Sequence, residues 1–194
     1  LALIYALAFG LAIGATATVA RRIGENDPKA AAQSAAHVIY LGVITSVAIS
    51  VVGIVFAPQI LTLLGAKPHL LEEGSRFMRI MLGGNAVVVF IFLLNAIFRG
   101  AGDAAIAMRV LILANALNIV LSPCFIFGVG FFPELGVTGA AVGTTIGRGI
   151  GVAYAAWRLF RPGNRVHVGR EAWRLDPRLL WKLGKLSSTA VFQL

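Results

Sequence analysis

The sequence predicts an all-α polytopic membrane protein with five transmembrane helices and the start of a sixth. Hydrophobic residues make up 58% of its 194 residues and charged residues 13%, whereas about a quarter of the residues in a soluble domain are charged. Five runs of the chain are almost free of Asp, Glu, Lys and Arg, and about 20 apolar helical residues cross a hydrocarbon core ~30 Å thick. None of the runs alternates with a period of two, so the pattern is typical of helices rather than of a transmembrane barrel.

The five runs give the predicted helices in chain order: residues 1–20, 30–66, 80–98, 110–133 and 135–157. The second run is longer than one span needs, and the fifth is rich in glycine and contains one charge, Arg148. A sixth helix is predicted to begin at Pro177, because Asp176 is a typical N-cap and proline is favoured at the first helical position. The chain opens without Met inside one apolar run and stops inside another, which predicts a fragment of a longer polypeptide.

Basic residues gather on alternate connections between these helices. The connections that include residues 21–29, 99–109 and 158–185 hold thirteen Lys and Arg, whereas the stretch 67–79 holds three and the connection after residue 133 holds none. The positive-inside rule therefore predicts that the first, third and fifth connections face the cytoplasm of a cell whose membrane the protein crosses several times. The net charge of +9 then reflects topology, and no nucleic-acid partner is expected.

The fifth connection differs from the others in length and composition. It is polar and basic, and the Pro-Gly-Asn sequence at 162–164 is typical of a turn. A connection this long predicts a boundary between two membrane lobes. We therefore expect an N-terminal transmembrane lobe over residues 1–160, a cytoplasmic linker over 161–176 and the start of a second lobe over 177–194.

Four segments of the chain match one known family in order and spacing. They are GATATVARRIGENDPKAAAQSA (14–35), NAIFRGAGDAAIAMRV (95–110), NALNIVLSPCFIFGVGFFPELGVTGAAVGTT (115–145) and LDPRLLWKLGKLSSTA (175–190). Together they resemble the multidrug and toxic compound extrusion (MATE) family. In that family the segments are similar to the turn between helices two and three, the Arg-Gly-x-Gly-Asp turn between helices four and five, helices five and six, and the entry to helix seven.

The resemblance implies a twelve-helix transporter of two six-helix lobes, of which this chain would supply helices two to seven. It implies a cation-coupled antiporter that exports amphipathic organic cations or drugs by alternating access. The expected partners are the drug, a proton or sodium ion and the lipid bilayer, with no cofactor and a monomeric full-length protein. A flippase of lipid-linked saccharide precursors has the same overall fold and is the alternative. It would favour a strongly cationic cavity, and in this chain only Arg148 lies at depth.

The fourth run carries the most informative polar side chains. Asn115, Asn118 and Ser122 are spaced three and four apart, so they lie within one narrow arc of a helix. Amides inside a bilayer need hydrogen-bond partners or water, so this face is predicted either to line a wet cavity or to hold neighbouring helices together. The resemblance favours a cavity role for Asn118, because the family's N-terminal lobe uses an Asn at the matching place. Pro123 is expected to kink the helix, since it cannot donate to the carbonyl group of Ile119.

Ser122 also marks a departure from the family. Many members carry an Asp at the matching position, and all eight acidic residues of this chain lie in connections or at helix ends. An antiporter needs a group whose charge alternates, so the coupling carboxylate is expected outside this chain. A second departure is Asn85, which stands where the family often has Pro, so no kink is expected there. His37, near the end of its predicted helix, is interpreted as a packing or interfacial residue.

The fifth run combines a glycine stripe with the charge at depth. Glycines at every fourth position predict a close-packing face: Gly139, Gly143, Gly147 and Gly151. Arg148 is three residues from Thr145, and an unpaired Arg near mid-bilayer costs about 3 kcal/mol or more. Arg148 is therefore expected either to pair or reach the interface, or to line the cavity with Thr145 and organise cations there.

Catalytic chemistry is not predicted. The chain has no cluster of acids of the kind that membrane transferases use for a metal or a diphosphate, and it lacks GxxxxGK[ST] and His-Glu-x-x-His sequences. The single Cys124 excludes a disulfide framework and a Cys-based zinc site. No catalytic or metal site is therefore expected. A scaffold or receptor would explain the spans but not the asparagine face.

Overall fold

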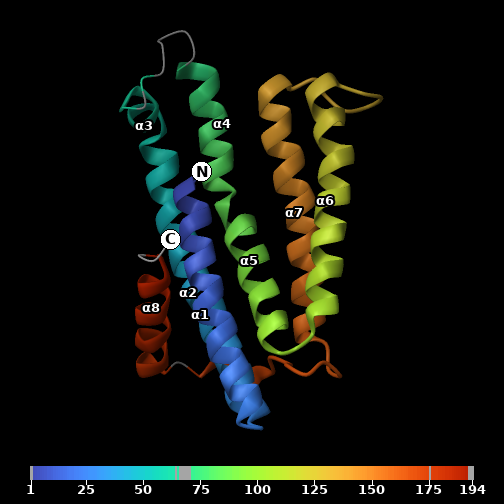
Figure 1. The fold of residues 1–194 in the computed structure, drawn as a ribbon. Helices are drawn as coiled ribbons and strands as arrows, with labels where there is room; N and C mark the ends of the chain where they lie inside the picture. Colours follow the sequence, from blue (N-terminus) through green and yellow to red (C-terminus); the bar gives the residue numbers. More distant parts are fainter. Residues whose placement is uncertain (1, 64, 66–70, 175, 192–194) are drawn as a thin grey trace.

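The computed structural model describes residues 2–63, 65, 71–174 and 176–191. Over these residues the chain is an α-helical bundle without β-strands (Figure 1). The α-helices, in chain order, are α1 (Ala2–Gly24), α2 (Pro28–Val55), α3 (Ala57–Leu63), α4 (Leu71–Gly83), α5 (Asn85–Gly100), α6 (Ala104–Phe127), α7 (Gly136–Phe160) and α8 (Pro177–Val191). A short 3-10 helix, η2 (Arg170–Trp173), precedes α8.

The long helices stand side by side and fall into two groups. α1, α2, α4 and α5 form one group, and α6 and α7 form a pair beside α5 (Figure 1). The α1–α2 turn, the α5–α6 turn and residues 161–174 lie at one end of the bundle, which we call the basic end because residues 161–174 and the helix ends beside these connections carry most of the Lys and Arg. α3, the start of α4 and the α6–α7 loop lie at the opposite end.

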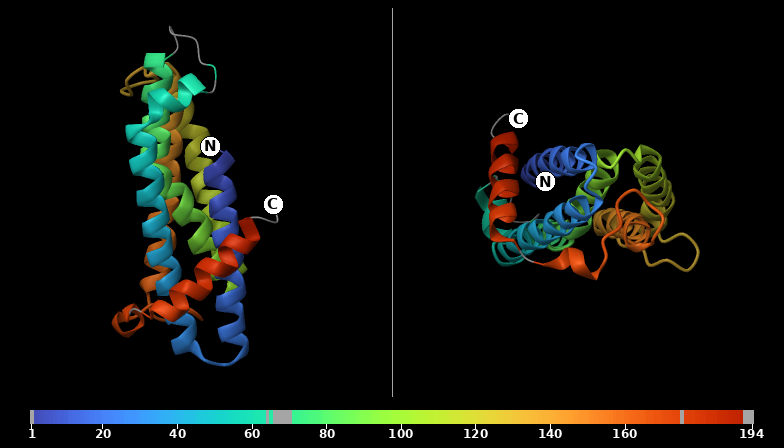
Figure 2. Two further views of the ribbon diagram at one scale, coloured as in Figure 1. Left: turned by 90° about the vertical axis from the view of Figure 1, so that its left-hand side faces the viewer. Right: turned by 90° about the horizontal axis from the view of Figure 1, so that it is seen from below.

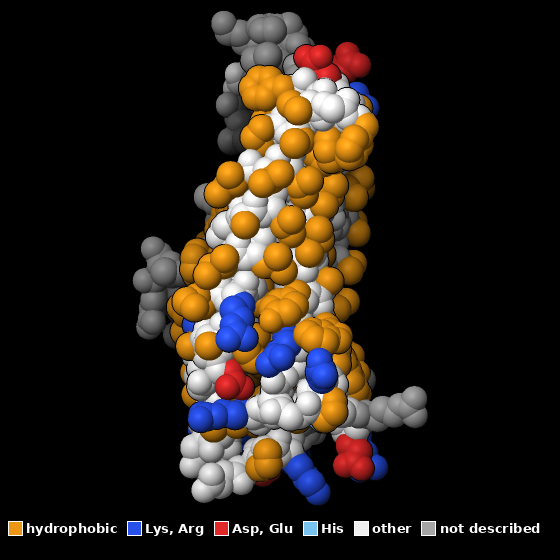
Figure 3. Space-filling model, turned by 90° about the vertical axis from the view of Figure 1, so that its right-hand side faces the viewer, with side chains coloured by type: hydrophobic (Ala, Val, Ile, Leu, Met, Phe, Trp, Pro, Cys, Tyr) orange, Lys and Arg blue, Asp and Glu red, His pale blue; other side chains and the backbone are white. Residues whose placement is uncertain are grey.

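Apolar helices of membrane-spanning length make up most of the bundle. Among the described residues, four helical stretches are long and apolar enough to cross a membrane: Ile4–Gly24, Pro28–Val55, Gly74–Gly100 and Ala104–Phe127. α7 is of similar length, contains Arg148 and packs along α6. On the side formed by α6 and α7, hydrophobic side chains cover the surface and basic side chains gather in a band toward the basic end (Figure 3). The predicted all-α, multi-pass membrane protein is confirmed.

The second predicted run is divided between two helices. α2 ends at Val55, and α3 begins at Ala57 with Pro58 as its second residue. Proline has no N–H group with which to continue the α2 ladder, but it is well suited to the first turn of a new helix. The run 30–66 is therefore one long spanning helix followed by a short one.

The fourth predicted run extends beyond its helix. α6 ends at Phe127, because Gly128 adopts a left-handed backbone (φ 65°) and caps the helix. Residues 129–133, which the run of uncharged residues included, therefore lie in the loop to α7. Pro123 lies inside α6, and the helix continues through it to its end.

The span Gly74–Gly100 is interrupted at Gly84, where α4 ends and α5 begins. The buried Asn85 amide donates from Nδ2 to the carbonyl oxygens of Leu82 (2.5 Å) and Ser46 (3.1 Å) and to Ser50 Oγ (2.8 Å). Ser50 Oγ in turn lies 3.3 Å from the carbonyl oxygen of Leu82 and 3.2 Å from that of Gly83. Carbonyl groups freed by a break inside a membrane need such partners. The loss of Pro predicted no kink at Asn85, but the helix is interrupted at Gly84, and Asn85 and Ser50 accommodate this break.

Small residues let α1 approach α5 closely. Thr16 Oγ1 donates to the carbonyl oxygen of Ala96 (3.2 Å), and a Cβ atom on Gly100 would lie 2.8 Å from the carbonyl oxygen of Thr16. Ala8 and Ala15 of α1 are almost fully buried. The backbones of α1 and α5 therefore approach closely, and large side chains such as Phe98, Leu93 and Ile4 are buried in the core around this contact.

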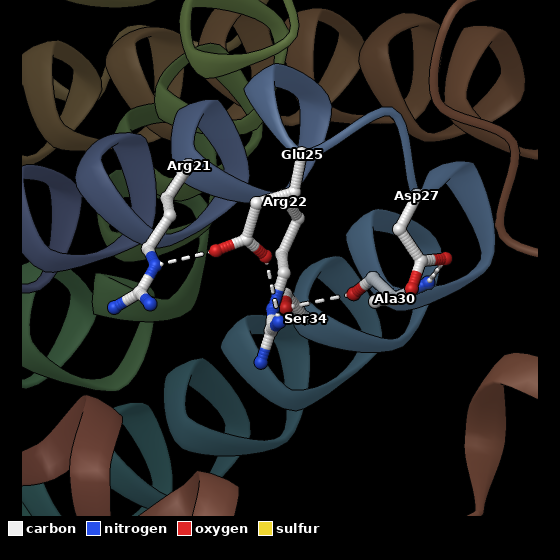
Figure 4. A network of polar contacts seen from close by, with 6 residues as sticks. All are labelled: Arg21, Arg22, Glu25, Asp27, Ala30 and Ser34. Atoms are coloured by element: carbon white, nitrogen blue, oxygen red, sulfur yellow. Dashed lines mark hydrogen bonds and ion pairs between the residues drawn. The ribbon is translucent and has the colours of Figure 1, made fainter.

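The α1–α2 turn is held by a local network at the basic end (Figure 4). Glu25 forms ion pairs with Arg21 Nε and Arg22 Nη1, both at 2.8 Å. Hydrogen bonds from Arg21 and then Arg22 lower the pKa of the exposed Glu25 carboxyl group. Asp27 caps α2, because its Oδ1 accepts from the backbone N–H of Ala30 (2.9 Å).

Residues 161–174 and α8 fold back onto the bundle rather than leaving it. Val166, Val168 and Ala172 are buried, and the N–H of Val168 donates to the carbonyl oxygen of Leu159 (3.3 Å). α8 packs against α1 and α2, with Leu183 buried in the contact (Figure 2). The helix start predicted at Pro177 is confirmed, and Asp176 Oδ1 accepts from the N–H of Arg178 (2.9 Å).

We expect Asn85→Ala in the full-length protein to lower the free energy of unfolding by about 1–2 kcal/mol, because buried backbone acceptors at the break lose their donor. Unfolding in detergent, followed by circular dichroism, measures the change. Asn115→Ala is the matched control, since that amide is exposed on α6 and its loss is expected to cost less than about 0.5 kcal/mol. Equal destabilisation by both variants would contradict the role of Asn85.

Candidate functional site

The glycine stripe of α7 lies directly against α6. A Cβ atom at Gly143 would lie 2.8 Å from Ser122 Cα, and one at Gly147 would lie 3.0 Å from the backbone nitrogen of Asn118. At Gly151 the nearest atom would be Ala114 Cβ (2.9 Å), and at Gly139 it would be the carbonyl oxygen of Phe125. Side chains at these four positions would push the helices apart, so the stripe sets the short distance between α6 and α7.

This close approach brings Asn118 and Thr144 together. Asn118 Nδ2 donates to Thr144 Oγ1 at 2.8 Å, and the asparagine is half-buried. Ser122, one turn along α6, has a buried Oγ without a hydrogen-bond partner among the described residues. Thr145 bonds within its own helix, donating to the carbonyl oxygen of Ala141 (2.8 Å). The α6–α7 contact therefore holds one bonded polar pair and one spare hydroxyl group.

Asn115 lies apart from that pair. It is exposed and lines a groove of about 590 Å³ along α6, together with Arg99, Met108 and Ile119. The arc predicted for Asn115, Asn118 and Ser122 is therefore divided in the structure. Asn118 and Ser122 contact α7, whereas Asn115 faces an open and mostly apolar groove.

Arg148 joins α7 to α1. Its Nη1 donates to Tyr5 Oη at 2.9 Å, and its guanidinium carbon lies 5.8 Å from the centre of the Tyr5 ring. The Tyr5 ring packs edge-on against Phe92 of α5, with 6.0 Å between ring centres. α1 and α7 do not pack on each other directly, because α5 contacts both, so this side-chain contact bridges them. Tyr5 lies 143 residues from Arg148, and no local spacing in the sequence could have indicated the pair.

The polar groups of the α6–α7 contact and of the Arg148–Tyr5 contact are neutral amides, hydroxyl groups and one guanidinium group. Among the described residues, no group of three or more His, Cys, Asp or Glu is arranged to hold a metal ion. Ser122 cannot exchange a proton near neutral pH as a carboxylate could. The arrangement can therefore accept and donate hydrogen bonds, but in the described part of the chain it lacks an acid beside Asn118.

Comparison with known proteins finds one family. The family model described as MatE matches residues 1–124. "Probable multidrug resistance protein NorM" of Thermotoga maritima is 33% identical over 153 residues, which cover 77% of this chain and 32% of that protein. "Multidrug export protein MepA" of Staphylococcus aureus is 30% identical over 147 residues, 74% of this chain and 32% of that protein. This chain thus spans about a third of the length of these curated relatives.

Solved structures match nearly the whole chain. Inward-facing and outward-facing structures of a multidrug resistance MATE family transporter of the MOP superfamily each match with a TM-score of 0.87 and 32% identity, over 97% of this chain. They cover 42% and 41% of those chains. The fold and these similarities place the chain in a class of multi-pass membrane transporters. The chain belongs to the MATE family.

We expect Gly143→Ala to destabilise the full-length protein by about 1–3 kcal/mol, since the added methyl group meets the α6 backbone at Ser122 and overpacks the contact. Gly149→Ala on the same helix is the control, because its Cβ atom would lie 3.7 Å from Val87 Cγ1, an ordinary contact. The thermal midpoint in detergent compares the two. If both variants unfold at the wild-type temperature, the stripe does not set the helix distance.

Proposed function

We propose that the whole protein exports amphipathic organic cations or drugs in exchange for protons or sodium ions. The observation that supports this most directly is the similarity to relatives named as multidrug resistance and multidrug export proteins. These relatives give no support to the flippase alternative. This chain then supplies part of the first lobe, and its own residues bind and guide substrate rather than catalyse a reaction.

Alternating access is the proposed mechanism, with the two lobes rocking about a central cavity. The chain matches the inward-facing and the outward-facing structures with the same TM-score, as expected if the helices of the first lobe move together as one body. We propose residues 1–160 as the N-terminal lobe, 161–176 as the inter-lobe linker and 177–194 as the start of the second lobe. The basic end is proposed to face the cytoplasm, as the positive-inside rule requires, and the full-length protein to act as a monomer.

Asn118 is proposed to contribute the main polar contact to the substrate or coupling ion. Its Nδ2 is bonded to Thr144, which leaves its Oδ1 and the spare hydroxyl group of Ser122 on the same helix. Asn115, Thr145 and Arg148 are proposed as further cavity residues, and Pro123 as a point where α6 deforms. The coupling carboxylate is proposed to lie in the rest of the protein, since Ser122 replaces the family's Asp.

Export of a fluorescent organic cation from cells that express the complete gene tests the function. The proton and sodium gradients are collapsed separately during the assay. We expect export to stop when one gradient is removed, which would also name the coupling ion. A protein that reaches the membrane but moves no cationic dye under either gradient would overturn the proposal.

We expect Asn118→Ala to reduce dye export several-fold without loss of protein from the membrane, because a positioned amide is removed from the proposed cavity. Thr144→Val is expected to give a similar loss, and the double variant no more than either single one, since both remove the same hydrogen bond. Initial export rates normalised to membrane abundance measure the effect. Export at the wild-type rate in Asn118→Ala would exclude a cavity role for this residue.

A further inference from the structure

His37 is fully buried on α2 near the basic end, with both ring nitrogens hydrogen-bonded. Its Nδ1 lies 2.7 Å from the carbonyl oxygen of Gln33, and its Nε2 lies 2.8 Å from the backbone nitrogen of Asp176. A backbone N–H group can only donate, so Nε2 must be the acceptor. The proton is then on Nδ1, which donates to the Gln33 carbonyl group. The geometry therefore requires a neutral imidazole ring in one tautomer.

The residue that His37 holds is the N-cap of α8. Asp176 Oδ1 accepts from the N–H of Arg178, and the carbonyl oxygen of Asp176 accepts from the N–H groups of Leu179 and Leu180 (3.1 Å each). The N–H group that donates to His37 is thus the last one before the helix starts. A bond to α2 at this point fixes where α8 begins relative to the rest of the bundle.

Tyr40 adds a second attachment one turn along α2. Its hydroxyl group donates to the carbonyl oxygen of Trp173 (3.3 Å), and the two rings meet edge-on with centres 5.3 Å apart. The Trp173 ring also stacks on Phe160 at the end of α7, at 6.3 Å between centres. His37 and Tyr40, which we call the α2 clamp, therefore tie Trp173 and Asp176 to α2. The segment between α7 and α8 is held at both of these residues.

We propose that His37 is a pH-dependent positioning residue, which holds the α7–α8 segment and α8 on α2 when neutral and releases them when protonated. Protonation would put an N–H group on Nε2, facing the N–H group of Asp176, so an acceptor would become a second donor. It would also place a charge in a fully buried ring, which is costly. Imidazole is the side chain that ordinarily changes charge between about pH 5 and 8. Acidification on the basic side would therefore loosen the tie between α2 and α8.

The charged groups around the α2 clamp do not change the expected effect of acidification, which is to loosen the tie between α2 and α8. Among the described residues, the hydrogen bonds of the His37 ring go to two backbone groups, and no carboxylate accepts from it. A pocket of about 1040 Å³ between the start of α2 and the segment before α8 contains groups of both signs: Asp27, Lys29, His167, Glu171 and Arg174. On the other elements packed on α2, the described charged side chains of the basic end are Arg21 and Arg22 on α1, Arg99 on α5, and Arg178 and Lys185 on α8, with Glu25 bonded to Arg21 and Arg22. Asp176, whose N–H donates to His37, also carries a carboxylate, and its Oδ1 accepts from the N–H of Arg178. Glu72, Arg76 and Arg79 belong to α4, which begins at the opposite end of the bundle.

The consequence for transport rests on the proposed function, because α8 would begin the second lobe. A clamp that opens at low pH would let the second lobe move more freely against the first. The hydrogen bond itself does not depend on what the protein transports. The test therefore measures the clamp directly, and transport is measured separately.

Hydrogen–deuterium exchange of the full-length protein tests the clamp, read on peptides covering residues 170–180 at pH 8 and pH 5.5. Rates are divided by those of the unfolded peptides at the same pH, which removes the intrinsic pH dependence of exchange. In wild type we expect the corrected exchange to be faster at the lower pH, on the order of tenfold, the factor that one hydrogen bond of ordinary net strength supplies. Exchange that is equally slow at both pH values would overturn the proposal.

His37→Gln is the decisive variant, because its amide oxygen can accept from the N–H of Asp176 at any pH. We expect slow exchange at both pH values in His37→Gln and fast exchange at both in His37→Ala. His167→Gln is the matched control, since His167 is an exposed histidine of the same segment, and it is expected to keep the wild-type response. A pH response that persists in His37→Gln would show that another group is responsible.

Tyr40→Phe keeps the proposal testable if His37→Ala does not fold. It removes the hydroxyl bond to Trp173 and leaves the His37 bond, so we expect faster exchange at pH 8 with the pH response preserved. Dye export measured at both pH values with wild type and His37→Gln gives the functional readout. A clamp that responds to pH in a protein that exports no dye would leave the clamp standing and would reject the proposed function.

Discussion

Hydrocarbon offers no hydrogen bonds, so every backbone group that a membrane helix leaves unpaired must find a partner inside the protein. This constraint accounts for the position of the polar side chains in the bundle. The break at Gly84 is accompanied by Asn85 and by Ser50 of the neighbouring helix, which supply partners to the freed carbonyl groups. The break and its partners lie on two different helices, so α2 and the α4–α5 span depend on each other for their shape.

The close packing of α6 and α7 is subject to the same constraint, that polar groups inside the membrane need partners within the protein. The glycines of α7 remove side chains from the contact, so the backbones of the two helices approach closely. A polar side chain at this contact must then bond across it, as Asn118 does with Thr144, or remain unpaired, as Ser122 Oγ does among the described residues. Glycine spacing and asparagine position are thus two parts of one arrangement.

The sequence was sufficient for the features that depend on local pattern and insufficient for those that depend on contact over long distances. Uncharged runs located the spanning helices, and the Asp-Pro pair located the start of α8. The breaks at Phe56 and Gly84 were missed, because hydropathy does not register a backbone discontinuity. Spacing grouped Asn115 with Asn118, but a helical arc does not reveal which neighbour each part of it meets. Tyr5 could not be assigned to Arg148 across 143 residues of chain.

The docking of α8 on α1 and α2 has a consequence for how the protein is made. Chains are synthesised from the N-terminus, and domains form largely in that order. α8 packs on α1 and α2, which both precede it in the chain. The surface on which it docks is therefore synthesised before α8 itself. The first helices therefore serve as a template during synthesis, and they set the orientation in which α8 is placed.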